Sequence, residues 1–418
     1  MNLYFSNSIQ NKTFAGYMRW AILGMWILVG SCANNKGKDG RFKAPDNILS
    51  IVYNEDKAIE LSINESSTEY QLLFLEHNED SYIGNVDKII FSEGNIFVLD
   101  KAQRMIFIFD RNGNYMAKID DTGRGGNEYI QINDFCLSKT SNTILASVVC
   151  GGHSSVVFEY GINGNMVNRF NLPFSSYKIE KSNNRLFFYS DYTTTKEHGH
   201  NIHITSAKGK VISKSFPYKK RQGGWGIESD VFKVDEKGDI YYFPVFCDTI
   251  YRLKEDNSFE PVIVLKATGE THADELCELY QNISPERFME TEHKFFYQRL
   301  SNVRLFQDLI YFEADKNNIG ENFIFDIQSD KLYKCISNDY FSTTVVSPLS
   351  TDKTWLVGIV NPFEVHDFVN QVIDKNVDYE NFMEDNVFIK EIFEKTNFDS
   401  NPVIVKYKLK EKDWDAPQ

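Results

Sequence analysis

The 418-residue sequence contains only 10 prolines, and beyond residue 32 it has no hydrophobic run of membrane length. The missing runs argue against a protein anchored by transmembrane helices, because one such helix needs about 20 apolar residues. Basic residues are also few: 45 Lys and Arg stand against 59 Asp and Glu, which gives a formal net charge of −14. This deficit argues against nucleic acid as a partner, since a phosphate backbone is bound by clustered positive charge.

Cysteine motifs are missing as well. None of the five cysteines after Cys32 forms a C-x-x-C pair, which argues against zinc-finger and thioredoxin-like sites, and we predict no cofactor. Aromatic residues, in contrast, are abundant, with 33 Phe and 22 Tyr. Because aromatic side chains favour strands, this composition predicts a β-rich protein.

The N-terminus has the features of a bacterial signal peptide. Lys12 and Arg19 precede an apolar run over 20–29, which is too short for a spanning helix. The following Leu28–Cys32 stretch (LVGSC) resembles a lipobox, in which the cysteine carries the lipid. We therefore predict a signal peptide over 1–31, lipidation of Cys32, membrane attachment through that lipid, and a flexible tether over 32–45.

A unit of short strands and polar turns recurs along the rest of the chain. Its clearest copy covers Val86–Ile119, where apolar strands alternate with Gly- and Asn-rich turns, which is typical of four antiparallel strands. Weaker copies of the third strand lie at 156–160, 202–205, 249–253, 322–327 and 403–409.

The spacing of these copies predicts the architecture. Most are roughly 45 to 50 residues apart, the length of one four-stranded propeller blade. Six copies predict an all-β protein, a six-bladed β-propeller over 46–412, with 413–418 as a tail. Helical periodicity predicts insertions near 275–302 and 364–394. An early strand within 48–63 is expected to pair with the C-terminal strand and close the ring. A β-sandwich with insertions would explain the strands but not their spacing.

Taken together, these motifs resemble a known family. The lipobox, the Val86–Ile119 unit, the run Gly123–Tyr129 (GRGGNEY) and the closing Asn401–Leu409 (NPVIVKYKL) are similar to six-bladed β-propeller lipoproteins of Bacteroides-type bacteria. The glycine-rich run is similar to the end of an NHL repeat, although it lacks the usual proline. The resemblance implies a propeller fold and a cell-envelope location, periplasmic or at the outer membrane, but no particular activity.

Two segments are candidate sites. Arg221 and Trp225, in a basic glycine-rich loop, suit stacking on a sugar or peptide, and the alternative is a blade connector whose Trp packs on its neighbour. The only histidine cluster contains His198, His200 and His203. In a strand, the first two would share one face and the third would point away, so a surface segment entering a strand is favoured over a metal site.

Two further motifs invite a ligand-binding interpretation. Gly123–Tyr129 lacks the lysine and helix of a phosphate loop, so we interpret it as a connection between blades, with glycines in left-handed backbone conformations and Tyr129 packed between blades. Asp110–Asn114 matches the start of a calcium loop but lacks its later ligands, so we interpret it as a hairpin turn.

The sequence therefore favours a non-catalytic, lipid-anchored module that binds a ligand or protein, linked to glycan or peptide uptake. One alternative is a hydrolase or lyase with its site in the central channel, and a second is a structural subunit of an envelope complex. Three or more converging Asp, Glu or His side chains in the channel would favour the enzyme, whereas a lining of apolar residues and lysines would argue against it.

Overall fold

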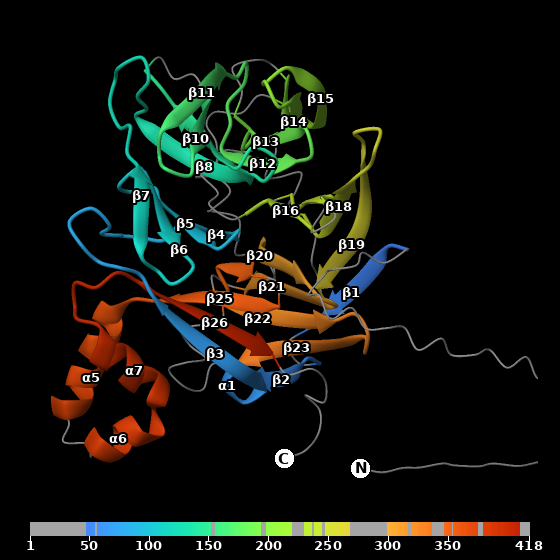
Figure 1. Ribbon diagram of the computed structural model, residues 1–418. Coiled ribbons are helices and arrows are strands. Elements are labelled where there is room, and N and C mark those ends of the chain that lie inside the picture. Colours follow the sequence, from blue (N-terminus) through green and yellow to red (C-terminus); the bar gives the residue numbers. More distant parts are fainter. Residues whose placement is uncertain are drawn as a thin grey trace, which may run out of the picture. The chain divides into compact units, whose positions relative to one another are not determined.

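The structure is a computed structural model that describes residues 47–409 except 55–56, 152–154, 194–197, 220–229, 236–237, 245–246, 268–298, 317–318, 337–346, 353 and 375–378. This part belongs to one compact unit, residues 38–418. Its strands form six sheets, each with four antiparallel strands. The protein is thus a six-bladed β-propeller, which confirms the predicted fold (Figure 1).

Each of the first three blades is a simple meander of four consecutive strands. Blade 1 contains β4 (Lys88–Ser92), β5 (Asn95–Asp100), β6 (Met105–Asp110) and β7 (Tyr115–Ile119). Blade 2 contains β8 (Gln131–Ser138), β9 (Thr143–Val149), β10 (Ser155–Gly161) and β11 (Met166–Asn171). Blade 3 contains β12 (Lys178–Ser182), β13 (Arg185–Tyr189), β14 (His198–Ser206) and β15 (Val211–Lys219).

Blades 4 and 5 each gain a fifth strand from the N-terminal segment. Blade 4 contains β16 (Phe232–Val234), β17 (Ile240–Tyr242), β18 (Thr249–Leu253) and β19 (Phe259–Ala267), with β1 (Leu49–Tyr53) parallel to β19. Blade 5 contains β20 (Arg299–Phe306), β21 (Leu309–Lys316), β22 (Ile319–Asp326) and β23 (Lys331–Ile336), with β2 (Ile59–Ser62) parallel to β23. The added strands cover two outer edges that would otherwise leave backbone groups unpaired.

Blade 6 closes the ring with strands from both ends of the described chain. It contains β24 (Ser350–Asp352), β25 (Trp355–Val360), β26 (Val403–Leu409) and, outermost, β3 (Ser67–Phe74). The closing partner of β26 is therefore β3, and the prediction that the strand within 48–63 closes the ring is wrong. The two earlier strands have the same local pattern as a closing strand, and an apolar pattern does not identify a distant partner.

Six buried clusters hold the blades together, one at each interface between adjacent blades. The cluster between blades 6 and 1, for example, joins Ile404 and Val357 to Phe107 and Phe109. Strands such as β6 are covered on both faces by neighbouring blades, so they are continuous apolar runs instead of alternating ones. This double covering explains the apolar runs that mark the repeat in the sequence.

The helices follow the ring closure. After α1 (Ile63–Ser66), the described helices are α5 (Pro362–Asp374), α6 (Tyr379–Asp385) and α7 (Val387–Lys395), which lie together between β25 and β26 (Figure 1). Val365, Val369 and Ile392 pack into the cluster between blades 5 and 6, which confirms the second predicted insertion. None of the described helices is long and apolar enough to span a bilayer.

The first predicted insertion is wrong at its C-terminal end, and the rest of it lies outside the described residues. Residues 299–302 belong to β20 and pair with β21. Because the register shifts between Ser301 and Arg304, the apolar Leu300 and Val303, which are three residues apart in the sequence, pack in the same buried cluster. An irregularity of this kind in a strand imitates helical spacing in the sequence.

Candidate functional site

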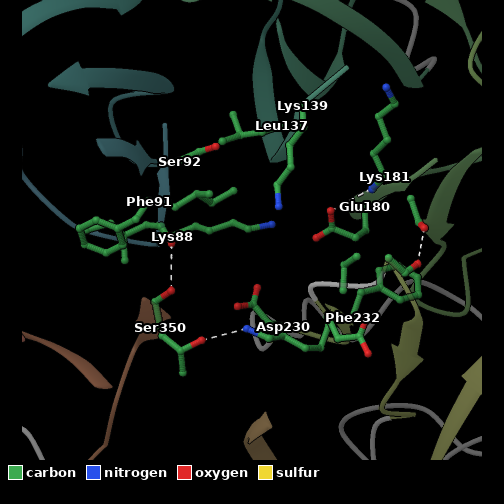
Figure 2. A pocket seen from close by; sticks show the side chains of 18 of the residues that line it. Lys88, Phe91, Ser92, Leu137, Lys139, Glu180, Lys181, Asp230, Phe232 and Ser350 are labelled. Carbon is green, nitrogen blue, oxygen red and sulfur yellow. Dashed lines mark hydrogen bonds between the residues drawn. The ribbon is translucent and has the colours of Figure 1, made fainter. Parts of the chain in front are cut away.

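A polar cavity of about 450 Å³ lies where the first strands of the blades meet. Among these strands, β12 contacts both β8 and β16, and β24 contacts both β4 and β20. Residues of five blades line the cavity, and the charged side chains of Lys88, Lys139, Glu180 and Asp230 reach into it (Figure 2). Its volume is within the usual range for small-molecule sites.

Lys88 links the first three blades at the floor of the cavity. Its Nζ donates to Asp134 Oδ1 at 3.0 Å and to the Phe135 carbonyl at 2.9 Å, while Asp134 Oδ2 accepts the Ile179 N–H at 2.9 Å. Burial works against the charge of Lys88, but Asp134, Asp230 and Glu180 together raise its pKa above the ordinary value. Lys88 therefore stays protonated and is held in an ion pair.

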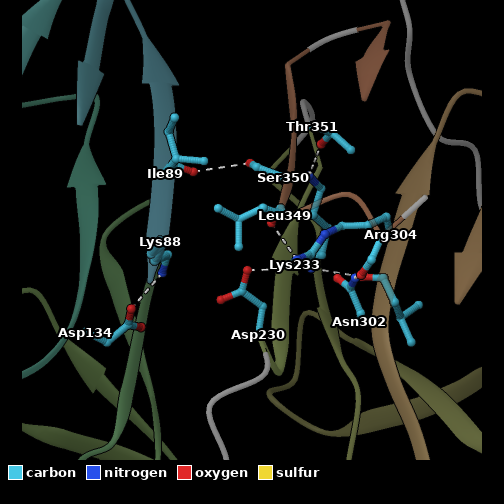
Figure 3. Close-up of polar contacts among 12 residues, drawn as sticks. Lys88, Ile89, Asp134, Asp230, Lys233, Asn302, Arg304, Leu349, Ser350 and Thr351 are labelled. Carbon is cyan, nitrogen blue, oxygen red and sulfur yellow. Dashed lines mark hydrogen bonds and ion pairs between the residues drawn. The ribbon is translucent and has the colours of Figure 1, made fainter. Parts of the chain in front are cut away.

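A second charged group faces Lys88 across the cavity (Figure 3). Arg304 Nη1 lies 3.5 Å from Asp230 Oδ2, and Arg304 Nη2 donates to the Leu349 carbonyl at 2.6 Å. Burial works to raise the pKa of Asp230, but Lys88, Arg304, Lys178 and Lys233 outweigh it and lower the pKa. The Asp230 carboxylate thus interacts electrostatically with several cations.

Lys233 lies beside this group on β16. Its Nζ donates to Thr351 Oγ1 on β24 at 2.9 Å. Burial, followed by the positive charge of Arg304, lowers the pKa of Lys233 to about 8. A lysine in this position loses its proton far more readily than a lysine in water.

Three more charged residues lie on blades 2 and 3. Lys181 Nζ donates to Thr140 Oγ1 at 3.1 Å and to Ser138 Oγ, and Lys139 has no hydrogen bond or ion pair with a described residue. Glu180 accepts the N–H of Lys181, and burial raises its pKa despite the nearby Lys88. The described lining therefore carries four lysines, with Asp235 as its third carboxylate, in a chain that is acidic overall.

The lining contains carboxylates, which would favour an enzyme, and also lysines, which would argue against one. Glu180 and Asp230 enter the cavity, but lysines outnumber the carboxylates. Among the described residues, no group of three or more His, Cys, Asp and Glu side chains could hold a metal ion.

Of the predicted site residues, His200 and His203 do not line the cavity. Arg221, Trp225 and Cys32 lie outside the described residues, and Asp230, which follows that loop, lines the cavity. The three histidines lie on β14. The His203 ring stacks on Phe174 with centroids 3.9 Å apart, and burial lowers its pKa to about 3. The rings of His200 and His203 are 6.5 Å apart, and the side chain of His198 is outside the described part.

The cavity lysines were not among the predicted site residues, although a signal exists. The first strands of blades 1 and 3 begin with similar sequences, Lys88-Ile89-Ile90 and Lys178-Ile179-Glu180. A lysine at the same position of two repeats marks the same place in the ring. That comparison would have pointed to the centre of the propeller.

The glycine-rich run connects blades 1 and 2, as predicted. Tyr129 is fully buried in the cluster between these blades and donates its hydroxyl to the Arg104 carbonyl at 2.7 Å. The expected left-handed backbone is wrong, because none of the three glycines has a positive φ. Instead, the Glu128 carboxylate accepts the Gly125 N–H at 2.6 Å, and a Cβ on Gly123 would collide with it. The carboxylate of Glu128 thus occupies this glycine-rich turn.

The calcium-like motif is a hairpin turn, as predicted. Asp110 Oδ1 accepts the N–H groups of Asn112 and Asn114 at 2.8 and 3.0 Å, and Gly113 adopts a φ of 89°. These bonds join β6 to β7 and satisfy the carboxylate within the turn.

Comparison with known proteins places the chain in a family. Residues 47–408 match the family described as a domain of unknown function, DUF4934. The chain belongs to this family. No curated protein matches it.

Two solved structures resemble the fold. A putative exported protein from Bacteroides fragilis aligns with a TM-score of 0.68 at 16% identity, over 87% of this chain and 100% of that one. A member of the DUF4221 family from Bacteroides vulgatus aligns with a TM-score of 0.50 at 12% identity, over 85% of this chain and 99% of that one. At such low identity these similarities concern the fold alone.

Proposed function

We propose that this protein is a non-catalytic ligand-binding module of the bacterial cell envelope and that its ligand occupies the central cavity. The observation that carries the proposal is the cavity of about 450 Å³, into which five blades place charged and hydroxyl side chains. Convergence of polar groups from separate elements is typical of small-molecule sites. A role in glycan or peptide uptake is consistent with such a site.

An envelope location has independent support. The signal-like N-terminus precedes Cys32, and the similar Bacteroides fragilis protein is described as exported. We propose that lipidated Cys32 attaches the propeller to the membrane. Cys32→Ala is expected to move the protein from the detergent phase to the aqueous phase of a Triton X-114 partition, and intact mass should show the loss of acyl chains. Cys150→Ala is the matched control, and equal partitioning of both variants would contradict lipid attachment.

Ligand binding in the cavity can be tested without assuming the charge of the ligand. Thr140 is exposed at the rim, so Thr140→Trp places a bulky ring at the mouth of the cavity. In a binding screen of sugars, sugar acids, phosphates and peptides, we expect this variant to weaken the best ligand at least about tenfold, equivalent to about 1.4 kcal/mol.

The control is Val167→Trp on β11, the outermost strand of the same blade, where Val167 is 63% exposed. The proposal fails if both variants bind the ligand as the unmodified chain does. Arg221 and Trp225 are proposed to add to binding, and Trp225→Ala in the same screen tests that part.

Catalysis in the same cavity is the second candidate function. The lowered pKa of Lys233 favours it, because a partly deprotonated amine can accept a proton near neutral pH. As a hydrolase or lyase, the protein would convert the ligand found in the screen, and mass spectrometry of the incubated mixture would detect the product.

The helical insertion favours the alternative of a structural subunit. Phe363 and Val387 are each 59% exposed on α5 and α7. Exposed apolar groups of this kind mark contact surfaces when they are contiguous. Pull-down from native envelopes, with and without Phe363→Ser and Val387→Ser, tests this alternative, and unchanged partners would count against it.

A further inference from the structure

We propose that the cavity ligand is a small hydroxylated organic anion whose carboxylate or phosphate group binds to Lys139 and Lys233. This inference rests on the proposed function, since it assigns the chemistry of the ligand in the same cavity. It follows from which charged side chains of the cavity form ion pairs and which do not.

Two carboxylates near the cavity already have cationic partners. Asp134 is paired with Lys88 at 3.0 Å and also accepts a backbone N–H from blade 3. Asp230 faces Arg304 at 3.5 Å. These pairs join neighbouring blades, and neither carboxylate is within ion-pair distance of Lys139, Lys181 or Lys233.

Three lysines of the lining have no ion pair with a described residue. Lys181 and Lys233 donate to hydroxyl groups, which carry no countercharge, and Lys139 has no described partner. Glu180 is close by, but its one described hydrogen bond is to a backbone N–H. Lys139 and Lys233 therefore present ammonium groups to the cavity without an ion pair of their own, although Asp230 and Glu180 act on Lys233 electrostatically.

Near Lys233, a buried hydrogen-bond donor of Arg304 also lacks an acceptor. Arg304 is only 8% exposed, and its Nε has no hydrogen-bond acceptor among the described residues. A buried donor without an acceptor is costly. The low pKa of Lys233, which arises from burial and from Arg304, agrees with a missing countercharge at this place.

The remaining lining suits a hydroxylated ligand. Hydroxyl groups of Ser92, Thr140, Ser182, Ser350 and Thr351 surround the lysines. A hydroxyl that donates to the protein still accepts from a ligand, so these side chains can bind sugar hydroxyls. Sugar acids and sugar phosphates combine such hydroxyls with one anionic group.

The test is calorimetric titration of the full-length chain in detergent with four probes: galacturonate, glucose 6-phosphate, glucose and glucosamine. We expect one or both anions to bind at least about tenfold more tightly than glucose, because an ammonium group attracts an anion and not a neutral sugar. Binding of galacturonate alone assigns a carboxylate ligand, and binding of glucose 6-phosphate alone assigns a phosphate ligand. Either result supports the inference.

Lys139→Met retains the stem but removes the charge, and we expect it to weaken the anion about fivefold or more. Lys208→Met, on an exposed turn of blade 3, is the matched control and should have no effect. Glu180→Gln should tighten anion binding, because it removes a negative charge that lines the cavity and keeps an oxygen for the Lys181 N–H.

Other outcomes overturn the inference. Equal or tighter binding of glucose or glucosamine, weakened by Thr140→Trp but not by Lys139→Met, would refute an anionic ligand and leave the proposed function standing. Absence of anion binding would refute the inference, and if Thr140→Trp affects no ligand in the wider screen, the proposed function fails as well.

Discussion

At the scale of single residues, the most informative group is Lys233. Its ammonium group faces Thr351 on β24, and the charges acting on it are those of Arg304, Asp230, Glu180 and Lys139. Because its pKa is lowered to about 8, its charge disappears within a pH range in which ordinary lysines stay protonated. The same residue thus connects the binding and catalytic candidates, which differ in the protonation state that they require.

This difference predicts a pH dependence. If Lys233 binds an anion as a cation, affinity is full below pH 8 and falls as pH rises through 8, by up to about tenfold at pH 9. Titrations at pH 7 and pH 9 measure this, and Lys233→Met should flatten the profile. An affinity that is equal at both pH values would contradict a cationic role, and a turnover that increases over this range would favour catalysis.

At the scale of elements, closure of the ring depends on the pairing of β3 with β26. Val403, Ile404 and Val405 on β26 are fully buried, and the six residues from Val403 to Lys408 are in register with Phe74 to Glu69. Removal of β3 would expose the outer edge of blade 6 and part of the apolar surface beneath it. In contrast, β1 and β2 only add a fifth strand to complete blades.

Two truncations separate these roles. A chain that starts at Ser67 retains β3, and one that starts at Gly84 lacks it. We expect the second to lose at least about 3 kcal/mol more unfolding free energy than the first, since burial of one large apolar side chain contributes about 1.5 to 3 kcal/mol. Denaturant unfolding followed by circular dichroism measures both. Equal losses would show that β3 does not close the ring.

The elements also show how far the sequence predicts the fold. Third strands such as Met105–Asp110 could be located because two neighbouring blades cover them, which makes them continuous apolar runs. The parallel partners of β1 and β2 could not, because each pairing joins segments more than 200 residues apart in a register that no local pattern encodes. The helical prediction for residues 299–302 was wrong for a related reason. The register shift in β20 arises in its pairing with β21, and no local pattern encodes that pairing.

At the scale of the whole molecule, the site exists only in the closed ring. Lys88, Lys139, Lys181 and Lys233 come from four different blades and are brought together by the meeting of first strands. Each lysine, seen alone, is an ordinary polar residue within or next to a strand. The sequence therefore predicted the ring but not the residues that line its cavity, which become neighbours only when the ring closes.

The overall charge illustrates the same point. The chain carries a formal net charge of −14, which argues against nucleic acid as a partner, yet lysines predominate among the charged residues described around its centre. Four lysines and three carboxylates line the cavity, and a local excess of one charge attracts the opposite charge, whatever the total charge of the protein. The net charge of the whole chain thus gave no information about the charge of the cavity or of its ligand.

The most direct test of the central claim is a crystal structure of the protein soaked with the tighter-binding of galacturonate and glucose 6-phosphate. We predict that the anionic group lies within hydrogen-bond distance of Lys139 Nζ and Lys233 Nζ, with sugar hydroxyls on the serines and threonines of the lining. A ligand bound outside the cavity, or one that turns its anionic group away from these lysines, would contradict the account.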